Sequence, residues 1–141
     1  MALDRRAVME ATVLASALSG APSTLHALVK RHSVRAAVVY VYDATRAVGT
    51  LVPPGRPGFG RGIVVHLAIS MLCGEALART LPRDHPAEWG AAAGFVIGLV
   101  NVGLIGRSFP AIRALPLVPQ LADNTMFGTV FAVTLARRDR D

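Results

Sequence analysis

Lysine is almost absent from this chain, and charged residues of every kind are scarce. Lys30 is the single lysine among 15 basic residues, and charged residues make up 17% of the 141 positions. A soluble domain of ordinary composition is about one quarter charged, whereas 52% of this chain is hydrophobic. This balance indicates a membrane protein of one domain. The dominance of Arg over Lys, with abundant Ala, Gly and Pro, is typical of a GC-rich bacterial genome.

Cysteine is represented only by Cys73, which excludes an intramolecular disulfide. Cys73 lies inside an apolar run, where a small buried residue is expected. A metal site would need His66, Cys73 and Glu75 together with His26 or His85, but the H-x-x-x-H and C-x-x-C spacings of metal sites are absent. P-loop, dinucleotide and EF-hand patterns are absent as well. We therefore expect no metal and no cofactor.

The formal net charge of +6 admits two kinds of partner, nucleic acid or an anionic membrane surface. The basic residues stand at the ends of apolar runs, among them Arg5, Arg6, Lys30, Arg31 and Arg107. This placement is typical of membrane edges. A nucleic-acid surface needs basic residues gathered on one face with aromatic residues between them, and no such cluster is visible. The expected partner is the lipid bilayer, and no nucleic acid is expected.

Four apolar segments are long enough to cross a bilayer as helices. They cover about residues 7–29, 62–81, 89–106 and 120–136. A further helix, at about 34–52, carries Asp43 and Arg46, each of which would cost about 2.5–3.5 kcal/mol in the middle of a span. A surface-lying amphipathic or re-entrant helix avoids that cost, and a fifth span is the alternative. The predicted fold is an all-α transmembrane bundle of about four spans plus this helix.

A soluble all-α protein is the alternative fold, but the low lysine content and the lack of polar helix faces favour the membrane. With four spans, both termini lie on the same side. That side carries seven basic residues and the other side carries eight, so the count required by the positive-inside rule does not decide the orientation. The arginines near the termini closely abut spans, which favours cytoplasmic termini.

The N-terminal segment has two features that affect its interpretation. Two arginines before an apolar stretch are typical of a signal peptide, but Asp4 and Glu10 are unusual in one, so we expect a retained first span.

Gly20 and Pro22 interrupt the helix, and Ser23 is placed to cap its resumption. The interruption is either a kink filled by neighbouring helices or a discontinuous helix whose exposed backbone binds an ion or a substrate.

The segment "EWGAAAGFVIGLVN" carries a stripe of small residues along one helix face. Gly90, Gly94 and Gly98 form two overlapping GxxxG motifs, and Asn101 extends the same face. In lipid, where apolar side chains give little drive for association, small residues let helix backbones approach and polar side chains bond across the contact. We expect a helix-packing surface here. Its partner is either another span of this chain or a second copy.

Three ionisable side chains fall within or near the predicted spans and form a candidate polar relay: Glu75, His66 and Asp123. Such residues are costly in lipid and are functional candidates for that reason. The alternative is a bundle held by buried polar contacts, in which Glu75 pairs with Arg79 four residues later.

A catalytic interpretation uses one face of the same segment. His66, Ser70 and Cys73 are spaced i, i+4 and i+7, which places a base beside two nucleophiles. No oxyanion element or G-x-S-x-G turn accompanies them, so the interpretation leans away from an enzyme and assigns no catalytic residue.

At "GAPSTLHAL", "HLAISMLCGEALARTLP", "WGAAAGFVIGLVN" and "PQLADNTMFG", the chain resembles small multi-pass integral membrane proteins of actinobacterial type. The resemblance covers most of the chain and implies a multi-pass protein of the plasma membrane. It rests on general pattern, so it implies no site residues. We expect a non-enzymatic membrane protein, either a homo-oligomer or an accessory subunit of a membrane partner protein. A small transporter or channel that uses Glu75 and His66 is the alternative.

Overall fold

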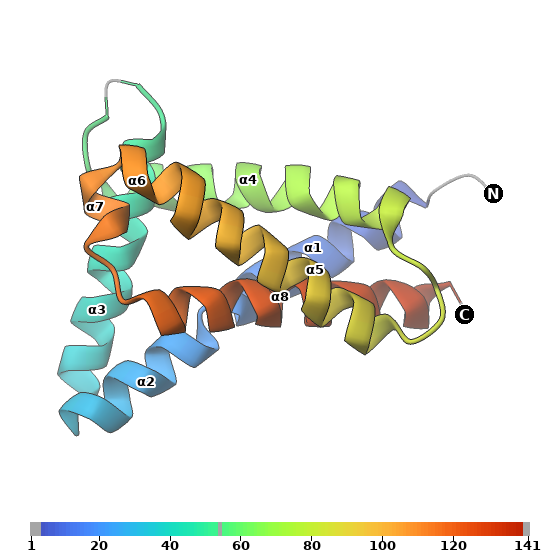
Figure 1. Cartoon of the computed structure of the whole chain (residues 1–141), viewed down its shortest axis with the longest axis horizontal. Coiled ribbons are helices and arrows are strands. Elements are labelled where there is room, and N and C mark those ends of the chain that lie inside the picture. The colour runs from blue at the N-terminus through green and yellow to red at the C-terminus, as the bar shows by residue number, and fades with distance from the viewer. Residues whose placement is uncertain (1–3, 54, 140–141) are drawn as a thin grey trace.

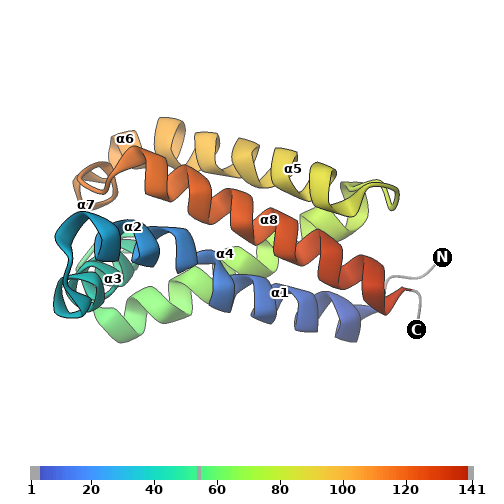
Figure 2. The same cartoon turned by 90° about the horizontal axis from the view of Figure 1, so that it is seen from below.

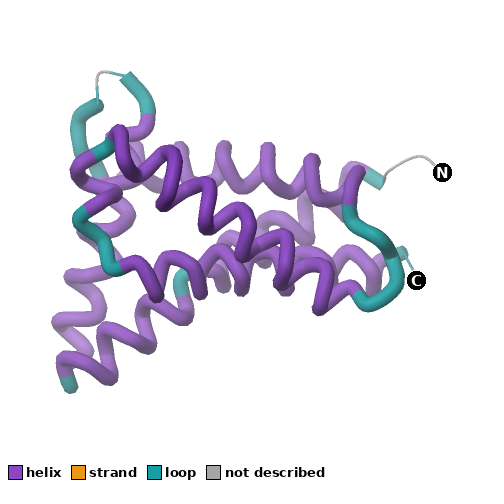
Figure 3. Tube along the Cα trace, viewed as in Figure 1, coloured by secondary structure: helices purple, strands orange, loops and turns teal. Residues whose placement is uncertain are grey.

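The computed structural model describes residues 4–53 and 55–139, which fold almost entirely into helices (Figure 3). These are α1 (Arg5–Ser19), α2 (Ala21–Arg31), α3 (Val34–Val48), α4 (Phe59–Thr80), α5 (Pro86–Val100), α6 (Gly106–Ser108), α7 (Pro110–Arg113) and α8 (Leu117–Arg138). A 3-10 turn, η1 (Gly49–Leu51), follows α3, and a π-helical segment, η2 (Asn101–Ile105), joins α5 to α6. No strand occurs within these residues, so the prediction of an all-helical chain is confirmed for them.

Helices α4, α5 and α8 run along an elongated bundle, and α1 runs beside them from one end to about the middle, where α2 continues toward the other end (Figures 1 and 2). Both chain termini lie at one end, which we call the terminal end. The short helices α2, α6 and α7 gather at the opposite end, together with α3, which lies across the bundle rather than along it (Figure 1). We call this the α3 end.

Three helical stretches are long and apolar enough to cross a membrane: Arg5–Arg31, Phe59–Thr80 and Pro86–Ser108. At 22 residues, α4 is about 33 Å long, close to the roughly 30 Å of a bilayer's hydrocarbon core. Helix α8 also has 22 residues, but Gln120, Asp123 and Asn124 make it more polar, and it is not among the three. The prediction of a fourth span therefore stays a prediction.

Helix α8 occupies the middle of the bundle and contacts α1, α2, α4 and α5 (Figure 2). No residue between positions 119 and 136 is exposed. Toward the terminal end, α8 supplies Phe127 and Phe131, whose rings stack with their centroids 6.3 Å apart. Around them, Ala7, Ala11 and Ala15 form a small-residue face on α1 that lets the two helices approach closely. Helix α8 thus carries its polar side chains among the other helices of the bundle.

The predicted helix at 34–52 corresponds to α3 and η1, and it is not among the stretches apolar enough to span. Its buried positions are Ala37 and Ala47, while Val34, Arg35 and Val38 are exposed. Large apolar side chains therefore stand next to a basic one on the outer face of α3. An amphipathic helix of this kind suits a membrane–water interface.

Helices α4, α5 and α8 each begin three residues earlier than the predicted spans. Two prolines explain part of the difference. Pro86 is the first residue of α5, and Pro119 lies in the first turn of α8. Proline has no backbone N–H, but the first turn of a helix needs none there, so both prolines are compatible with an earlier start.

Candidate functional site

The glycine stripe of α5 lies directly against α8. Gly90, Gly94 and Gly98 are all buried. A methyl group on Gly94 would overlap the backbone carbonyl of Asn124, and one on Gly90 would overlap that of Gly128. The two backbones therefore approach to a distance that only glycine permits. The partner of the stripe is a helix of the same chain, so this face is not available to a second copy.

Gly128 belongs to the same contact, although the sequence analysis did not single it out. A methyl group at Gly128 would overlap the Gly90 carbonyl and come within 2.8 Å of the Gly94 backbone. The signal was present in the sequence, because Gly128 and Ala132 are four residues apart and form a small-xxx-small pair. The glycines of α5 and α8 thus interlock from both sides.

Asn101 extends this contact with a chain of hydrogen bonds. Its amide nitrogen Nδ2 donates to Oδ1 of Asn124 at 2.9 Å, and Nδ2 of Asn124 donates to the Gln120 carbonyl at 2.8 Å. Asn101 is also the first residue of η2, where its carbonyl accepts from the Gly106 N–H in the wider π-type turn. The side-chain bond fixes the position of α5 along α8, because slippage of either helix would break it.

The break between α1 and α2 falls at Gly20. Pro22 has no N–H to donate to the Leu18 carbonyl, and the Gly20 N–H takes over that carbonyl instead. The Ser16 carbonyl, which Gly20 would serve in a continuous helix, accepts from the hydroxyl of Ser19 at 2.9 Å. The backbone groups released by the break are therefore satisfied by neighbours on the same helix.

The beginning of α2 is satisfied by a side chain of another helix. Asp123 of α8 accepts from the Ser23 backbone N–H at 2.9 Å through Oδ1, and from the Ser23 hydroxyl through Oδ2. The prediction that Ser23 caps this helix is wrong, because Ser23 is the third residue of α2 and itself donates to Asp123. A carboxylate at a helix N-terminus is favoured by the helix dipole as well as by hydrogen bonding.

Tyr40 of α3 lies beside this Ser23–Asp123 contact. Burial raises the pKa of the Tyr40 phenol, a side-chain hydrogen bond with Ser23 lowers that pKa, and the nearby Asp123 charge raises it. Three helices, α2, α3 and α8, therefore meet at one polar cluster near the α3 end.

The other members of the predicted relay lie elsewhere. Glu75 pairs with Arg79 at 2.5 Å on the outer part of α4. His66 is half-buried and lies against the backbone of Ser16, at the helix break. Nine residues separate His66 from Glu75, or about 14 Å along the helix. Across the described residues, no hydrogen bond or ion pair joins Glu75, His66 and Asp123 to one another.

The hydroxyl of Ser16 is buried and has no hydrogen-bond partner. It belongs to a row of buried hydroxyl residues on one face of α1 and α2, made up of Thr12, Ser16, Ser19 and Ser23. Thr12 donates to the Val8 carbonyl at 2.8 Å, Ser19 donates to the Ser16 carbonyl, and Ser23 donates to Asp123 of α8, so three of the four hydroxyls are bonded. The Ser16 hydroxyl is the exception.

Among the described residues, the fold does not bring together the side chains that the catalytic and metal interpretations require. Ser70 is buried, and neither Ser70 nor Cys73 forms a hydrogen bond with His66 in the described part of the chain. Within residues 4–53 and 55–139, no group of three His, Cys, Asp or Glu side chains is arranged to hold a metal ion.

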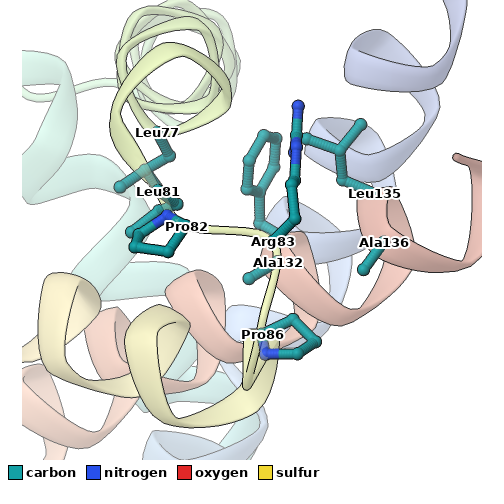
Figure 4. Close-up of a pocket in the computed structure, with 9 residues that line it drawn as sticks. Leu77, Leu81, Pro82, Arg83, Pro86, Ala132, Leu135 and Ala136 are labelled. Atoms are coloured by element: carbon teal, nitrogen blue, oxygen red, sulfur yellow. The ribbon is translucent and has the colours of Figure 1, made fainter.

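Hollows on the described part of the bundle include the following two. One, at the terminal end, is bordered by Leu77, Pro86 and Leu135, with the Arg83 side chain running alongside Leu135 (Figure 4). It has room for about one water molecule. The other is an apolar groove between α5 and α8, lined by Phe95, Val118, Leu121, Ala122, Thr125, Met126 and Thr129. Neither hollow gathers the polar groups that a catalytic site requires.

The threonines in the groove add little polarity to it. Thr125 donates to the Leu121 carbonyl and Thr129 donates to the Thr125 carbonyl, each at 2.8 Å. Their hydroxyls are therefore satisfied by their own helix, and the groove presents an apolar wall.

Comparison with protein families, with curated proteins and with solved structures finds no match to this chain.

Proposed function

We propose that this chain is a non-enzymatic integral membrane protein that crosses the bacterial plasma membrane four times, with α8 as its fourth span. The supporting observation is the distribution of polarity. Helix α8 carries Gln120, Asp123 and Asn124, yet none of its residues from 119 to 136 is exposed. Large apolar side chains point outward from the helices around it, among them Val13, Leu14, Val64, Leu72, Val96 and Leu99.

This arrangement differs from that of a water-soluble bundle, in which Asp, Asn and Gln side chains are mostly exposed. In lipid it is favourable, because polar groups that bond inside the bundle avoid the cost of facing hydrocarbon. Asn101, Asn124 and Asp123 are bonded in this way. Their contacts hold helices together and leave no assembled chemical site, which supports a structural or accessory role.

The role as an oligomer or accessory subunit rests on the outer surface of the bundle. Because α8 already covers the glycine stripe of α5, any partner must contact other faces. The apolar groove of α5 and α8 and the exposed valines and leucines of α4 are two apolar surfaces that remain for a partner helix. The partner is either a second copy or another membrane protein.

Extraction and topology mapping test this proposal. The chain should stay in the membrane fraction through an alkaline carbonate wash and leave it only with detergent. Purification in mild detergent, with the mass of the complex measured by light scattering, then distinguishes a homo-oligomer from a monomer. Release of the chain by carbonate would contradict the membrane proposal.

Transport is the second candidate, and one observation favours it. The break in the first long helix lies beside His66 and the unbonded Ser16 hydroxyl. Broken helices form ion and substrate sites in several transporter folds. Proton flux into liposomes should then fall in a His66→Gln variant and in a Glu75→Gln variant. Unchanged flux in both, or no flux in the parent protein, would exclude this candidate.

A further inference from the structure

The net charge of the molecule is concentrated at one end of the bundle. Six basic residues at the α3 end are exposed and form no ion pair among the described residues: Lys30, Arg31, Arg35, Arg56, Arg107 and Arg113. Asp43 is the one acidic side chain on the outside of this end in the described chain, and it pairs with Arg46 at 3.9 Å. The α3 end is therefore strongly basic and largely unneutralised.

The remaining two basic side chains of this end organise its surface. Arg46 lies over the Tyr42 ring, 5.6 Å from its centroid, and Tyr42 stacks on Phe59 of α4. Arg61 donates to the Val52 carbonyl at 2.6 Å and holds the loop that leads into α4. These contacts fix α3 and its loop against the bundle, so the exposed basic residues of this end extend from an ordered surface.

The terminal end differs, because its charges neutralise one another. Its described residues include six basic and six acidic side chains. Glu10 bonds both Arg6 and Arg138 at 2.9 Å, and Arg83 pairs with Asp139 at 3.3 Å. Two ends of similar arginine content thus have very different net charges.

The basic end also coincides with one edge of the apolar spans. Arg61 and Arg79 are 18 residues apart on α4, or about 27 Å along the helix. Trp89 and Arg107 are separated by the same number of residues on the next helical stretch. Both spacings are close to the thickness of a bilayer's hydrocarbon core. Arg61 and Arg107 therefore mark the plane where headgroups begin, and α3 lies at that level.

We propose that the α3 end binds the headgroups of anionic phospholipids. The inference rests on the proposed membrane location. Unpaired arginines at a headgroup plane, beside an amphipathic helix with outward-facing valines, match the negative charge of phosphate diesters and the apolar edge of the acyl chains. Guanidinium groups suit this role because each presents several donors to phosphate oxygens.

Lipid selectivity in reconstituted vesicles tests the proposal. The full chain is placed in phosphatidylcholine vesicles containing a trace of spin-labelled phosphatidylglycerol or, separately, spin-labelled phosphatidylcholine. The measured quantity is the ratio of the motionally restricted fractions of the two labels. We expect restricted phosphatidylglycerol to exceed restricted phosphatidylcholine several-fold. At about 1 M salt, where the screening length is about 3 Å, the ratio should approach one.

Two matched double variants locate the effect. Arg35→Gln with Arg113→Gln removes two exposed, unpaired arginines from the α3 end. Arg5→Gln with Arg137→Gln removes two exposed arginines from the terminal end that form no ion pair with any described residue. The first should lower the selectivity ratio partway toward one, because four of the six unpaired basic residues remain, and the second should leave it unchanged. Circular dichroism checks that both variants keep the parent's helix content.

Three outcomes would overturn the inference: no preference for phosphatidylglycerol, equal loss in both double variants, or a preference that persists at about 1 M salt. A complete lack of restricted lipid of either kind is a different result. It would show that the chain does not sit in the bilayer, and would overturn the membrane proposal itself.

Discussion

Asp123 of α8 accepts two hydrogen bonds from Ser23 of α2, a residue 100 positions earlier in the chain. One bond comes from the backbone N–H and the other from the hydroxyl, so a single carboxylate satisfies the beginning of α2. This contact ties the α3 end to the central helix. It also explains how an acidic residue is tolerated on α8, because both of its oxygens are bonded inside the bundle.

Replacing Asp123 with Ala should destabilise the fold by roughly 1–3 kcal/mol, because it removes hydrogen bonds to a charged group and leaves the Ser23 donors unbonded. The free energy of unfolding, measured by denaturant titration in mild detergent, checks this. Asp43→Ala is the control, since Asp43 is 60% exposed and forms only a 3.9 Å ion pair. The control should change stability by no more than about 1 kcal/mol. Equal effects of the two variants would contradict the role of Asp123.

Gly94→Ala should destabilise the contact between α5 and α8, because the added methyl group overlaps the Asn124 carbonyl. Overpacking of this kind costs roughly 1–3 kcal/mol. Gly60→Ala is the matched control, because a methyl group there meets nothing within 4 Å. That variant should be neutral or slightly more stable, since alanine favours a helix over glycine. Thermal unfolding in detergent measures both, and a Gly94 variant as stable as the Gly60 variant would refute the close packing.

Asn101 and Asn124 should show energetic coupling in a double-mutant cycle. The variants are Asn101→Ala, Asn124→Ala and the double replacement, each measured by unfolding in detergent. Interhelical hydrogen bonds in membrane proteins give coupling of about 0.6 kcal/mol on average and up to about 1.7 kcal/mol. A cycle that closes with purely additive effects would indicate that the 2.9 Å bond between them contributes nothing to stability.

The charge distribution predicts the orientation of the molecule. The cytoplasmic leaflet holds anionic lipids and attracts basic segments that lie next to the membrane. The α3 end should therefore face the cytoplasm and both termini should face outward, which is the reverse of the orientation that the arginines near the termini favour in the sequence. A C-terminal fusion to a reporter that is active only outside the cytoplasm should be active, whereas one inserted at Arg56 should not. The opposite pattern would contradict this orientation.

Much of the fold could be predicted from the sequence, because it depends on local patterns. The apolar segments, the amphipathic segment at 34–52 and the GxxxG stripe each follow from spacing along the chain. The sequence places the starts of α4, α5 and α8 three residues late, because a proline such as Pro86 suggests a boundary although the first turn of a helix accepts it.

The polar contacts could not be predicted in the same way. Ser23 and Asp123 meet only because α2 packs on α8, and no local pattern states which distant helix supplies a partner. For the same reason, the local cap expected at Ser23 was wrong. Glu75 and Arg79 illustrate the opposite case, since a pair four residues apart on one helix is a local feature.

The central claim is that α8 crosses the membrane as an enclosed polar span, and cysteine labelling of intact cells tests it most directly. In a Cys73→Ser background, single cysteines replace Asp84 between α4 and α5, Ala114 before α8 and Asp139 after it. A membrane-impermeant maleimide then reports which positions share a side. We expect Asp139→Cys to label like Asp84→Cys and unlike Ala114→Cys. If Asp139→Cys instead labels like Ala114→Cys, α8 does not cross, and the four-span account is wrong.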